Sequence, residues 1–469
     1  MAFNPFIYVA GLVMEAPLYH LVLEGLLVIW IFQLLFSKSY YIRKRPGLSA
    51  KEEEELIAEW TPEPLVPPCD DPPPENNNIV DKIATRTISI NGEERLNLAT
   101  TSFHGMNGDK SCIETALSAI DKYGVGACGP RAFYGTIDIH LEFEKRIAAH
   151  MGAEIAILYS YGFSTVSSSI NCYCKRMDIV FCDEGANLAI KKGIEASRSK
   201  VRYFKHNDTD DLNTLLEEHA RWERKNSRQA KVTKKFLVAE GLYNYYGDIC
   251  PLKELIAFKY KYGARLIIDE SYSFGVLGET GRGVAEYFGA DNSDIDVVTV
   301  SMDHALGSNG GFAYGTAYMI EIQRLGGLGY CFSAALPPYL TASALKALEL
   351  IDENPKLISR LKENSNYLYD QLWSLDGIKL SNHRDSPVFH LRLMAPTTWG
   401  QDFALLQRAA ERINARGVAV TMTTYVRSEE LILPEPSLRI VVNSCLTRED
   451  ITRVSGVVSE VVTEMLDAK

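Results

Sequence analysis

The side chains best suited to chemistry in this chain follow short apolar runs. Ser301 and His304 come after the run Asp296–Val300 and before the glycine-rich stretch Gly307–Gly311. An imidazole can transfer a proton or bind a metal ion, but the sequence clusters no further ligand around His304. Because an imidazole has no primary amine, His304 is excluded from Schiff-base chemistry.

Two glycine-rich segments accompany this one. Asp269 closes the apolar run Ala264–Asp269 and opens the segment D-E-S-Y-S-F-G-V-L-G-E-T-G-R-G. The other segment, Y-G-V-G-A-C-G-P-R, spans Tyr123–Arg131. One glycine-rich loop alone would be weak evidence for a function, whereas an ordered series at fixed spacings is strong evidence.

Together these segments resemble the α-oxoamine synthases, enzymes of the fold type I class that depend on pyridoxal 5′-phosphate (PLP). The family's patterns Y-G-x-G-x-x-G-x-R, D-E-A-H-S-x-G-x-x-G-x-x-G-R-G and D-x-x-x-G-T-x-S-K-A-x-G-x-x-G-G match in order, and the resemblance runs from Leu96 to the C-terminus. In the last pattern, His304 replaces the lysine that forms the Schiff base with PLP. The resemblance therefore implies a relative of a PLP enzyme that has lost the PLP chemistry.

Other positions that would face the cofactor differ from the family as well. Asp269 retains the carboxylate that pairs with the pyridinium nitrogen. The family's histidine that stacks on the pyridine ring is Asn187 here, and its histidine near the phenolic oxygen is Tyr272. The resemblance thus predicts a degenerate cofactor site with no covalent cofactor, made of Asn187, Asp269, Tyr272, Ser301 and His304.

The glycines that shape the fold are retained, so the domain is expected to have kept a use. In this family the active sites lie at a dimer interface, and loops of one subunit help to complete the other's site. The stretches EAPLYHLVLEG and EEEELIAEWTPEPLVPP extend the resemblance to a branch in which a lysine-free subunit pairs with a lysine-bearing homologue in the endoplasmic reticulum membrane. That branch condenses L-serine with palmitoyl-CoA to 3-ketodihydrosphingosine, with PLP held covalently by the partner. The resemblance implies a non-catalytic but required acyltransferase subunit, associated with membrane lipid and small regulatory membrane proteins.

Two segments are expected to contact the partner's active site. The glycine-rich turn offers backbone amides and a small side chain, and the second segment offers a hydroxyl for the partner's phosphate. The residues concerned are Cys128, Gly129, Pro130 and Arg131 in the turn, and Tyr330, Phe332 and Ser333 in the second segment. The alternative is that both segments pack only within their own subunit.

Two other functions stay open. A self-standing α-oxoamine synthase would bind PLP without a covalent bond or use His304 in different chemistry, and Asn187 and Tyr272 count against it. A membrane scaffold or regulatory pseudoenzyme would contribute nothing to an active site, and replacing Cys128 discriminates between it and the shared site.

Composition excludes other classes of function. The net charge of −11 leaves no basic excess for nucleic acid, and apolar and charged contents of 46% and 23% are ordinary for a globular protein. Nine cysteines without a C-x-x-C pair predict reduced thiols and no metal site. The length suits one large domain, a smaller one and added N-terminal segments.

A membrane-spanning helix is predicted near the N-terminus, over residues 17–37. Basic residues follow it at Lys38 and at Arg43–Arg45, which places the C-terminal side in the cytosol by the positive-inside rule. Glu24 interrupts the run, so a buried soluble helix is the alternative, and no cleavage site favours a secretory signal. In a spanning helix, His20 and Glu24 are candidates for contact with another membrane subunit.

The predicted fold is α/β: a large PLP-transferase-like domain with a mostly parallel sheet, and a smaller C-terminal α+β domain. Short apolar runs that alternate with helical patterns indicate this architecture. The expected strands are 155–159, 178–181, 235–239, 264–269 and 296–300, with 388–392 and 438–442 in the small domain. The predicted division is a lumenal segment 1–16, the span 17–37, an amphipathic juxtamembrane helix 38–60, a proline-rich connector and entry 61–94, the large domain 95–340 and the small domain 341–469.

Overall fold

The computed structural model describes residues 17–36, 48–62, 65 and 78–467, and it divides the chain into two compact units, Met1–Asn76 and Asn77–Lys469. In the first unit, α2 (Leu18–Phe36) has no buried residue. Helix α3 (Ala50–Glu59) starts at Ser49, whose side chain forms a reciprocal cap with Glu52. Both predicted helices are confirmed as helices over these ranges. Residues 37–47, 63–64 and 66–77, with most of the predicted connector, lie outside the described residues.

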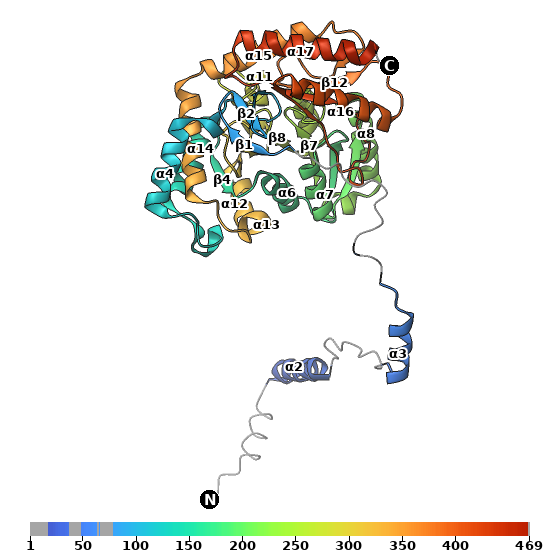
Figure 1. Ribbon diagram of the computed structural model, residues 1–469. Helices are drawn as coiled ribbons and strands as arrows, with labels where there is room; N and C mark the ends of the chain where they lie inside the picture. The colour runs from blue at the N-terminus through green and yellow to red at the C-terminus, as the bar shows by residue number, and fades with distance from the viewer. Residues whose placement is uncertain (1–16, 37–47, 63–64, 66–77, 468–469) are drawn as a thin grey trace, which may run out of the picture. The chain divides into compact units, whose positions relative to one another are not determined.

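A seven-stranded sheet forms the centre of the second unit (Figure 1). Its order is β4 (Ile155–Tyr159), β10 (Gly311–Gly315), β9 (Val297–Ser301), β8 (Arg265–Asp269), β7 (Lys235–Glu240), β5 (Ile179–Asp183) and β6 (Lys200–Phe204). Only β10 runs antiparallel to its neighbours. The mostly parallel sheet and its five predicted strands are therefore confirmed, whereas β6 and β10 were not predicted.

Helices cover both faces of this sheet because its strands are apolar on both sides. Val180, Phe236 and Ile267 belong to one core cluster together with residues of α6 (Gly162–Tyr173) and α7 (Leu188–Ser197). The neighbouring residues Phe181, Leu237 and Ile268 belong to a second, larger cluster on the other face. The other helices of the large domain are α4 (Lys110–Tyr123), α5 (Asp138–Met151), α8 (Thr209–Lys225), α9 (Ser227–Ala230), α10 (Leu252–Tyr262), α11 (Val284–Phe288), α12 (Ala317–Gly326) and α13 (Leu328–Cys331), with short turns η1 (Met106–Gly108), η2 (Arg131–Gly135) and η3 (Asn292–Asp294).

Two smaller sheets complete the unit. One is antiparallel, with the order β11 (Ile378–Leu380), β12 (Val388–Leu393), β15 (Leu438–Val441) and β14 (Thr421–Met422). It lies with the C-terminal helices α15 (Lys356–Leu372), α16 (Trp399–Ala415) and α17 (Arg448–Asp467), which Figure 1 shows in orange and red, after the long α14 (Pro338–Glu353). The predicted strands near 388–392 and 438–442 are confirmed.

The third sheet joins the start of this unit to its C-terminal part. It has the order β1 (Val80–Ile83), β2 (Thr87–Ile90), β3 (Glu93–Asn97) and β13 (Val418–Ala419), and β3 pairs with β13 in parallel. Residues from Asn77 onward therefore belong to one compact unit. The boundaries proposed at 94/95 and 340/341 stay predictions.

Candidate functional site

The predicted cofactor-side residues gather at the carboxyl ends of neighbouring parallel strands. Asp269 ends β8, Ser301 ends β9, and Asn187 caps the start of α7 through a hydrogen bond from the Ile190 amide to Asn187 Oδ1 (3.1 Å). Strands β7, β8 and β9 are adjacent and parallel, so side chains at their carboxyl ends meet at one edge. The fold thus explains why residues distant in sequence share one site.

Hydrogen bonds already occupy both carboxylate oxygens of buried Asp269. Its Oδ1 accepts from Ser271 N (3.1 Å) and Ser271 Oγ (2.6 Å), and also from Thr299 Oγ1 (3.4 Å). Its Oδ2 accepts from Asn187 Nδ2 (2.8 Å). Burial raises the pKa of Asp269 above its ordinary value, and the hydrogen bonds oppose that rise. The carboxylate is therefore held by its own chain.

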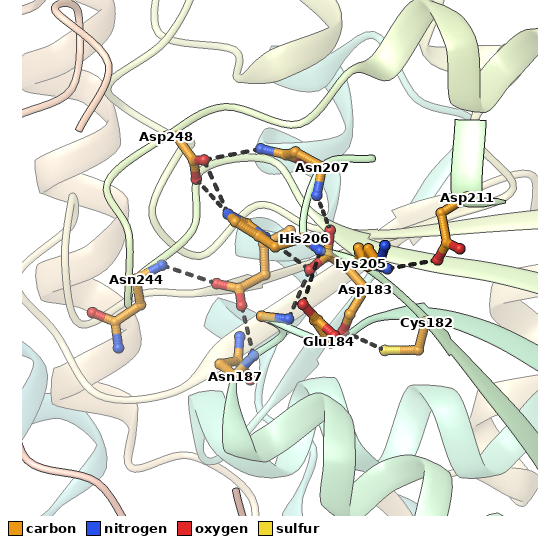
Figure 2. A network of polar contacts seen from close by, with 12 residues as sticks. Cys182, Asp183, Glu184, Asn187, Lys205, His206, Asn207, Asp211, Asn244 and Asp248 are labelled. Atoms are coloured by element: carbon orange, nitrogen blue, oxygen red, sulfur yellow. Dashed lines mark hydrogen bonds and ion pairs between the residues drawn. The ribbon is translucent and has the colours of Figure 1, made fainter. Parts of the chain in front are cut away.

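Glu240, at the end of β7, is a member of this site that sequence reasoning missed. Its Oε1 accepts from the backbone N–H of Asn187 (2.6 Å), and its Oε2 accepts from the backbone N–H of Asn244 (3.2 Å). Figure 2 labels the two asparagines. Burial, and then the nearby charge of Asp269, raises the pKa of Glu240 to about 8. The signal in the sequence was a glutamate directly after the predicted strand 235–239.

His304 is held by the polypeptide on the remaining side of the site. Its Nδ1 lies 2.7 Å from Thr101 Oγ1, and the centroid of its ring lies 4.2 Å from that of Tyr272. Burial, followed by the positive charge of Arg439, lowers the pKa of His304 to about 3, so the imidazole is neutral near pH 7. Within the described residues, no group of three His, Cys, Asp or Glu side chains is arranged to hold a metal ion.

The two segments expected to contact a partner lie beside each other. The Gly129 carbonyl accepts from the Ala335 amide (2.8 Å), and Pro130 forms a β-bridge with Ala334. The Arg131 guanidinium lies 5.4 Å from the centre of the Tyr330 ring. Backbone contacts therefore join the glycine-rich turn to the second segment, Tyr330–Ser333 with the residues that follow it.

The residues of the turn and of the second segment differ in exposure. Arg131 and Tyr330 are buried, and Arg131 pairs with Glu144 (2.9 Å). Cys128 is exposed in a left-handed conformation (φ +62°), and Phe332 is exposed. Ser333 is half-buried, and its Oγ donates to the Ala334 carbonyl (3.3 Å). Cys128, Pro130, Phe332 and Ser333 are thus the predicted contact residues whose side chains reach the surface.

A network of charged side chains around His206 lies near Asn187 (Figure 2). His206 Nδ1 lies 2.8 Å from Asp183 Oδ1, and His206 Nε2 lies 2.9 Å from Asp248 Oδ2. The ring also stacks on Tyr246, with a centroid separation of 4.0 Å. Burial alone would lower the pKa of His206, but the hydrogen bonds to Asp183 and Asp248 raise it to about 10. The imidazolium links the end of β5 to the turn that follows β7.

We expect His206 to make stability depend on alkaline pH. Its folded pKa is above the unfolded value of about 6.5, so its contribution is complete below that pH and is lost as pH rises through about 10. His206→Gln should lower the free energy of unfolding of the full chain by about 4 kcal/mol at pH 6, with a smaller loss at pH 10. Denaturant unfolding at both pH values measures this, with exposed His383→Gln as the control. A loss that does not depend on pH would contradict the charged state of His206.

The N-terminal unit carries the remaining predicted residues. His20 Nδ1 and Glu24 Oε1 lie 3.9 Å apart, one helical turn apart on α2. Among the residues that the structure describes, α2 is the one helix long and apolar enough to cross a membrane. Its length and composition agree with the predicted span.

Known proteins similar to this chain show which class of protein it belongs to. Residues 93–458 match the model of aminotransferase class I and II. A solved serine palmitoyltransferase with a PLP internal aldimine is similar to this chain with a TM-score of 0.74 and 26% identity, covering 83% of this chain and 92% of that one. The fold is that of the PLP-dependent transferases of fold type I.

Curated relatives then define the family. Long chain base biosynthesis protein 1 of Arabidopsis thaliana is 43% identical over 84% of this chain and 81% of its own length. Serine palmitoyltransferase 1 of Dictyostelium discoideum is 38% identical over 96% of this chain and 95% of its own length. The chain belongs to the serine palmitoyltransferase 1 (long chain base biosynthesis protein 1) family, whose members serve sphingolipid long-chain base synthesis.

Proposed function

We propose that this chain is the non-catalytic but required subunit of a serine palmitoyltransferase, and that a homologous partner supplies the lysine that holds PLP. One observation carries the proposal: His304 replaces the amine, while Asn187 and its neighbours already satisfy the carboxylate that would face the cofactor ring. Such a chain keeps the fold of the enzyme without its covalent chemistry.

The residues present do not fit PLP. A pyridinium nitrogen would have to share the Asp269 carboxylate with Asn187 at Oδ2 and with Ser271 at Oδ1. The Tyr272 ring lies against His304, where the family has a lysine beside a histidine. The start of α6 is a helix N-terminus, which would attract a phosphate. An Asp303 carboxylate oxygen lies close to it: an atom added at the Cβ position of Gly162 would be 3.2 Å from that oxygen. That negative charge would repel a phosphate.

Exposed apolar side chains support a protein partner at the turn and the loop. Val125 is exposed shortly before the turn, Phe133 and Tyr134 are exposed in η2 directly after it, and Phe332 is exposed in the second segment. Apolar side chains that share one surface favour burial by another protein. We propose that a lysine-bearing homologue covers them, and that Cys128 and Ser333 then border its active site.

The remaining parts of the proposal follow from the family. The partner's site condenses L-serine with palmitoyl-CoA to 3-ketodihydrosphingosine, with release of CoA and carbon dioxide. The α2 helix crosses the endoplasmic reticulum membrane once and leaves the large domain in the cytosol, in agreement with the basic residues after residue 37. His20 and Glu24 are proposed to contact a second membrane subunit, such as a small regulatory protein, because a carboxylate inside a membrane needs polar partners.

Reconstitution tests this proposal. The purified chain should form no product from L-serine and palmitoyl-CoA, and co-expression with a lysine-bearing homologue should give an active complex. The homologue expressed alone is the control, because a required subunit must raise its activity. Turnover by this chain alone, or full activity of the homologue without it, would contradict the proposal.

A further inference from the structure

Four neighbouring parallel strands begin at one edge of the large sheet. They are β8, β7, β5 and β6, which are adjacent in that order. Parallel strands share a direction, so the turns that lead into them lie at the edge opposite the candidate site. We call this surface the entry edge and define it as residues 174–178, 198–200, 231–235 and 261–265.

The entry edge is basic although the chain is acidic. The net charge of the chain is −11, yet the four segments of the entry edge together hold nine Lys or Arg residues and one Asp. Lys175, Lys200 and Lys234 form no ion pair with any residue that the structure describes. The edge therefore carries positive charge that the protein itself does not neutralise.

The acidic groups at and beside the entry edge already have partners. Asp178 is buried, and its carboxylate accepts from the Lys175 amide (2.9 Å) and the Lys234 amide (2.9 Å). Glu223 pairs with Lys235 (2.7 Å), and Asp296 pairs with Arg265 (2.6 Å). Lys175 Nζ donates to the Asn171 carbonyl (2.9 Å), which does not neutralise its charge, so Lys175 and Lys234 can both pair with an external anion.

A hollow of about 570 Å³ opens among these turns. Its basic lining consists of Lys175, Lys234, Lys235 and Arg265, its apolar lining includes Phe236 and Met319, and no acidic residue lines it. Cations at the mouth of an apolar hollow suit a molecule with a phosphate at one end and hydrocarbon at the other.

Exposed apolar side chains stand next to the basic ones. Met177 is 59% exposed beside Lys175 and Arg176, and Val232 is 65% exposed between Lys231 and Lys234. Lysine and arginine that alternate with apolar side chains on one surface are typical of proteins that lie on an anionic membrane. An acidic protein partner would use the cations but would give the two exposed apolar residues and the hollow no such role.

We propose that the entry edge binds anionic phospholipid, with a phosphate headgroup in the hollow and Met177 and Val232 in the interfacial layer. The span predicted at α2 provides a reason, because a chain anchored in a membrane keeps its other unit near lipid. The proposal rests on the charge, the hollow and the apolar residues of this chain, and it holds whether or not the chain is catalytic.

The test uses the full chain with its homologous partner in nanodiscs. One set contains phosphatidylcholine alone, and the other contains about one third phosphatidylserine. Hydrogen exchange at the amides of 174–178 and 231–235 should be slower by about tenfold in the anionic discs. Lys231→Glu with Lys234→Glu should abolish the difference. The matched control is Lys82→Glu with Lys356→Glu, which changes the charge equally at two exposed lysines outside the entry edge.

Soluble probes identify the source of the phosphate. Dihexanoyl phosphatidic acid should bind the complex at least about tenfold more tightly than inorganic phosphate, and the entry-edge variant should weaken its binding by a similar factor. Equal exchange in the two kinds of disc would overturn the proposal. Equal binding of the two probes would also overturn it and would indicate a site for free phosphate. Protection that depends on the partner chain but not on lipid would indicate a protein interface instead.

Discussion

Cys128→Trp is expected to lower kcat/KM of the assembled complex for L-serine by about 10- to 100-fold, without reducing the amount of complex. Cys128 is exposed in a left-handed turn, and hydrogen bonding of Gly129 to Ala335 fixes the backbone of that turn. The bulk of an indole must therefore extend outward, toward the proposed shared site. A displacement of about 1 Å in a bound substrate is enough for such a loss. Steady-state kinetics of the purified complex measure it.

The control for this substitution matches its backbone strain. Asn91 is also exposed with a left-handed backbone (φ +53°), but it lies in the turn between β2 and β3. Asn91→Trp should leave kcat/KM nearly unchanged. Kinetics competing L-serine against L-alanine add a second readout, because a misplaced substrate changes the choice of amino acid. If an intact Cys128→Trp complex retains normal kinetics, the chain acts as a scaffold and contributes nothing to the active site.

Arg131→Met is expected to destabilise the chain by about 3 to 5 kcal/mol. The guanidinium is buried and makes a 2.9 Å ion pair with Glu144, a hydrogen bond to Thr136 Oγ1 (3.1 Å) and another to the Leu158 carbonyl (3.3 Å). Its removal leaves the buried Glu144 carboxylate without an opposite charge, with the Leu158 amide (2.9 Å) still donating to it. Denaturant unfolding of the full chain measures the loss.

A second substitution tests the cause of this loss. Glu144→Gln in the Arg131→Met background removes the unpaired charge, so part of the stability should return. Arg146→Met breaks an ion pair with Asp352 that is partly exposed, and it should cost about 1 kcal/mol or less. An Arg131→Met variant as stable as the Arg146→Met variant would show that the buried pair contributes little.

The parts of the fold that follow from local pattern were predictable. Strands β4, β5, β7, β8 and β9 are continuous apolar runs between turns, because both of their faces are buried. Strand β10 (G-F-A-Y-G) is bounded by glycines and begins at the end of the glycine-rich stretch Gly307–Gly311, so its sequence resembles a loop. Its antiparallel position between β4 and β9 depends on tertiary pairing that no local pattern encodes.

The site divides in the same way. Asp269 and Asn187 were identifiable by motif, but the hydrogen bond between them joins residues 82 positions apart. The contact between His304 and Thr101 spans 203 positions, and neither residue predicts the other. Glu240 was missed because its raised pKa comes from burial and from the charge of Asp269, and both depend on the completed fold. The sequence thus indicated that the amine of the lysine is missing. The structure adds that Asn187 and Ser271 of the same chain hydrogen-bond to the Asp269 carboxylate.

The most direct test of the proposed function is to locate the cofactor in the active complex. Sodium borohydride fixes PLP to the amine that holds it, and peptide mass spectrometry then identifies the modified residue. We expect pyridoxyl-lysine in the homologous partner, at one per pair of chains, and no pyridoxyl group on this chain, whose lysine position is His304. A pyridoxyl group on a lysine of this chain, formed in step with activity, would contradict the central claim.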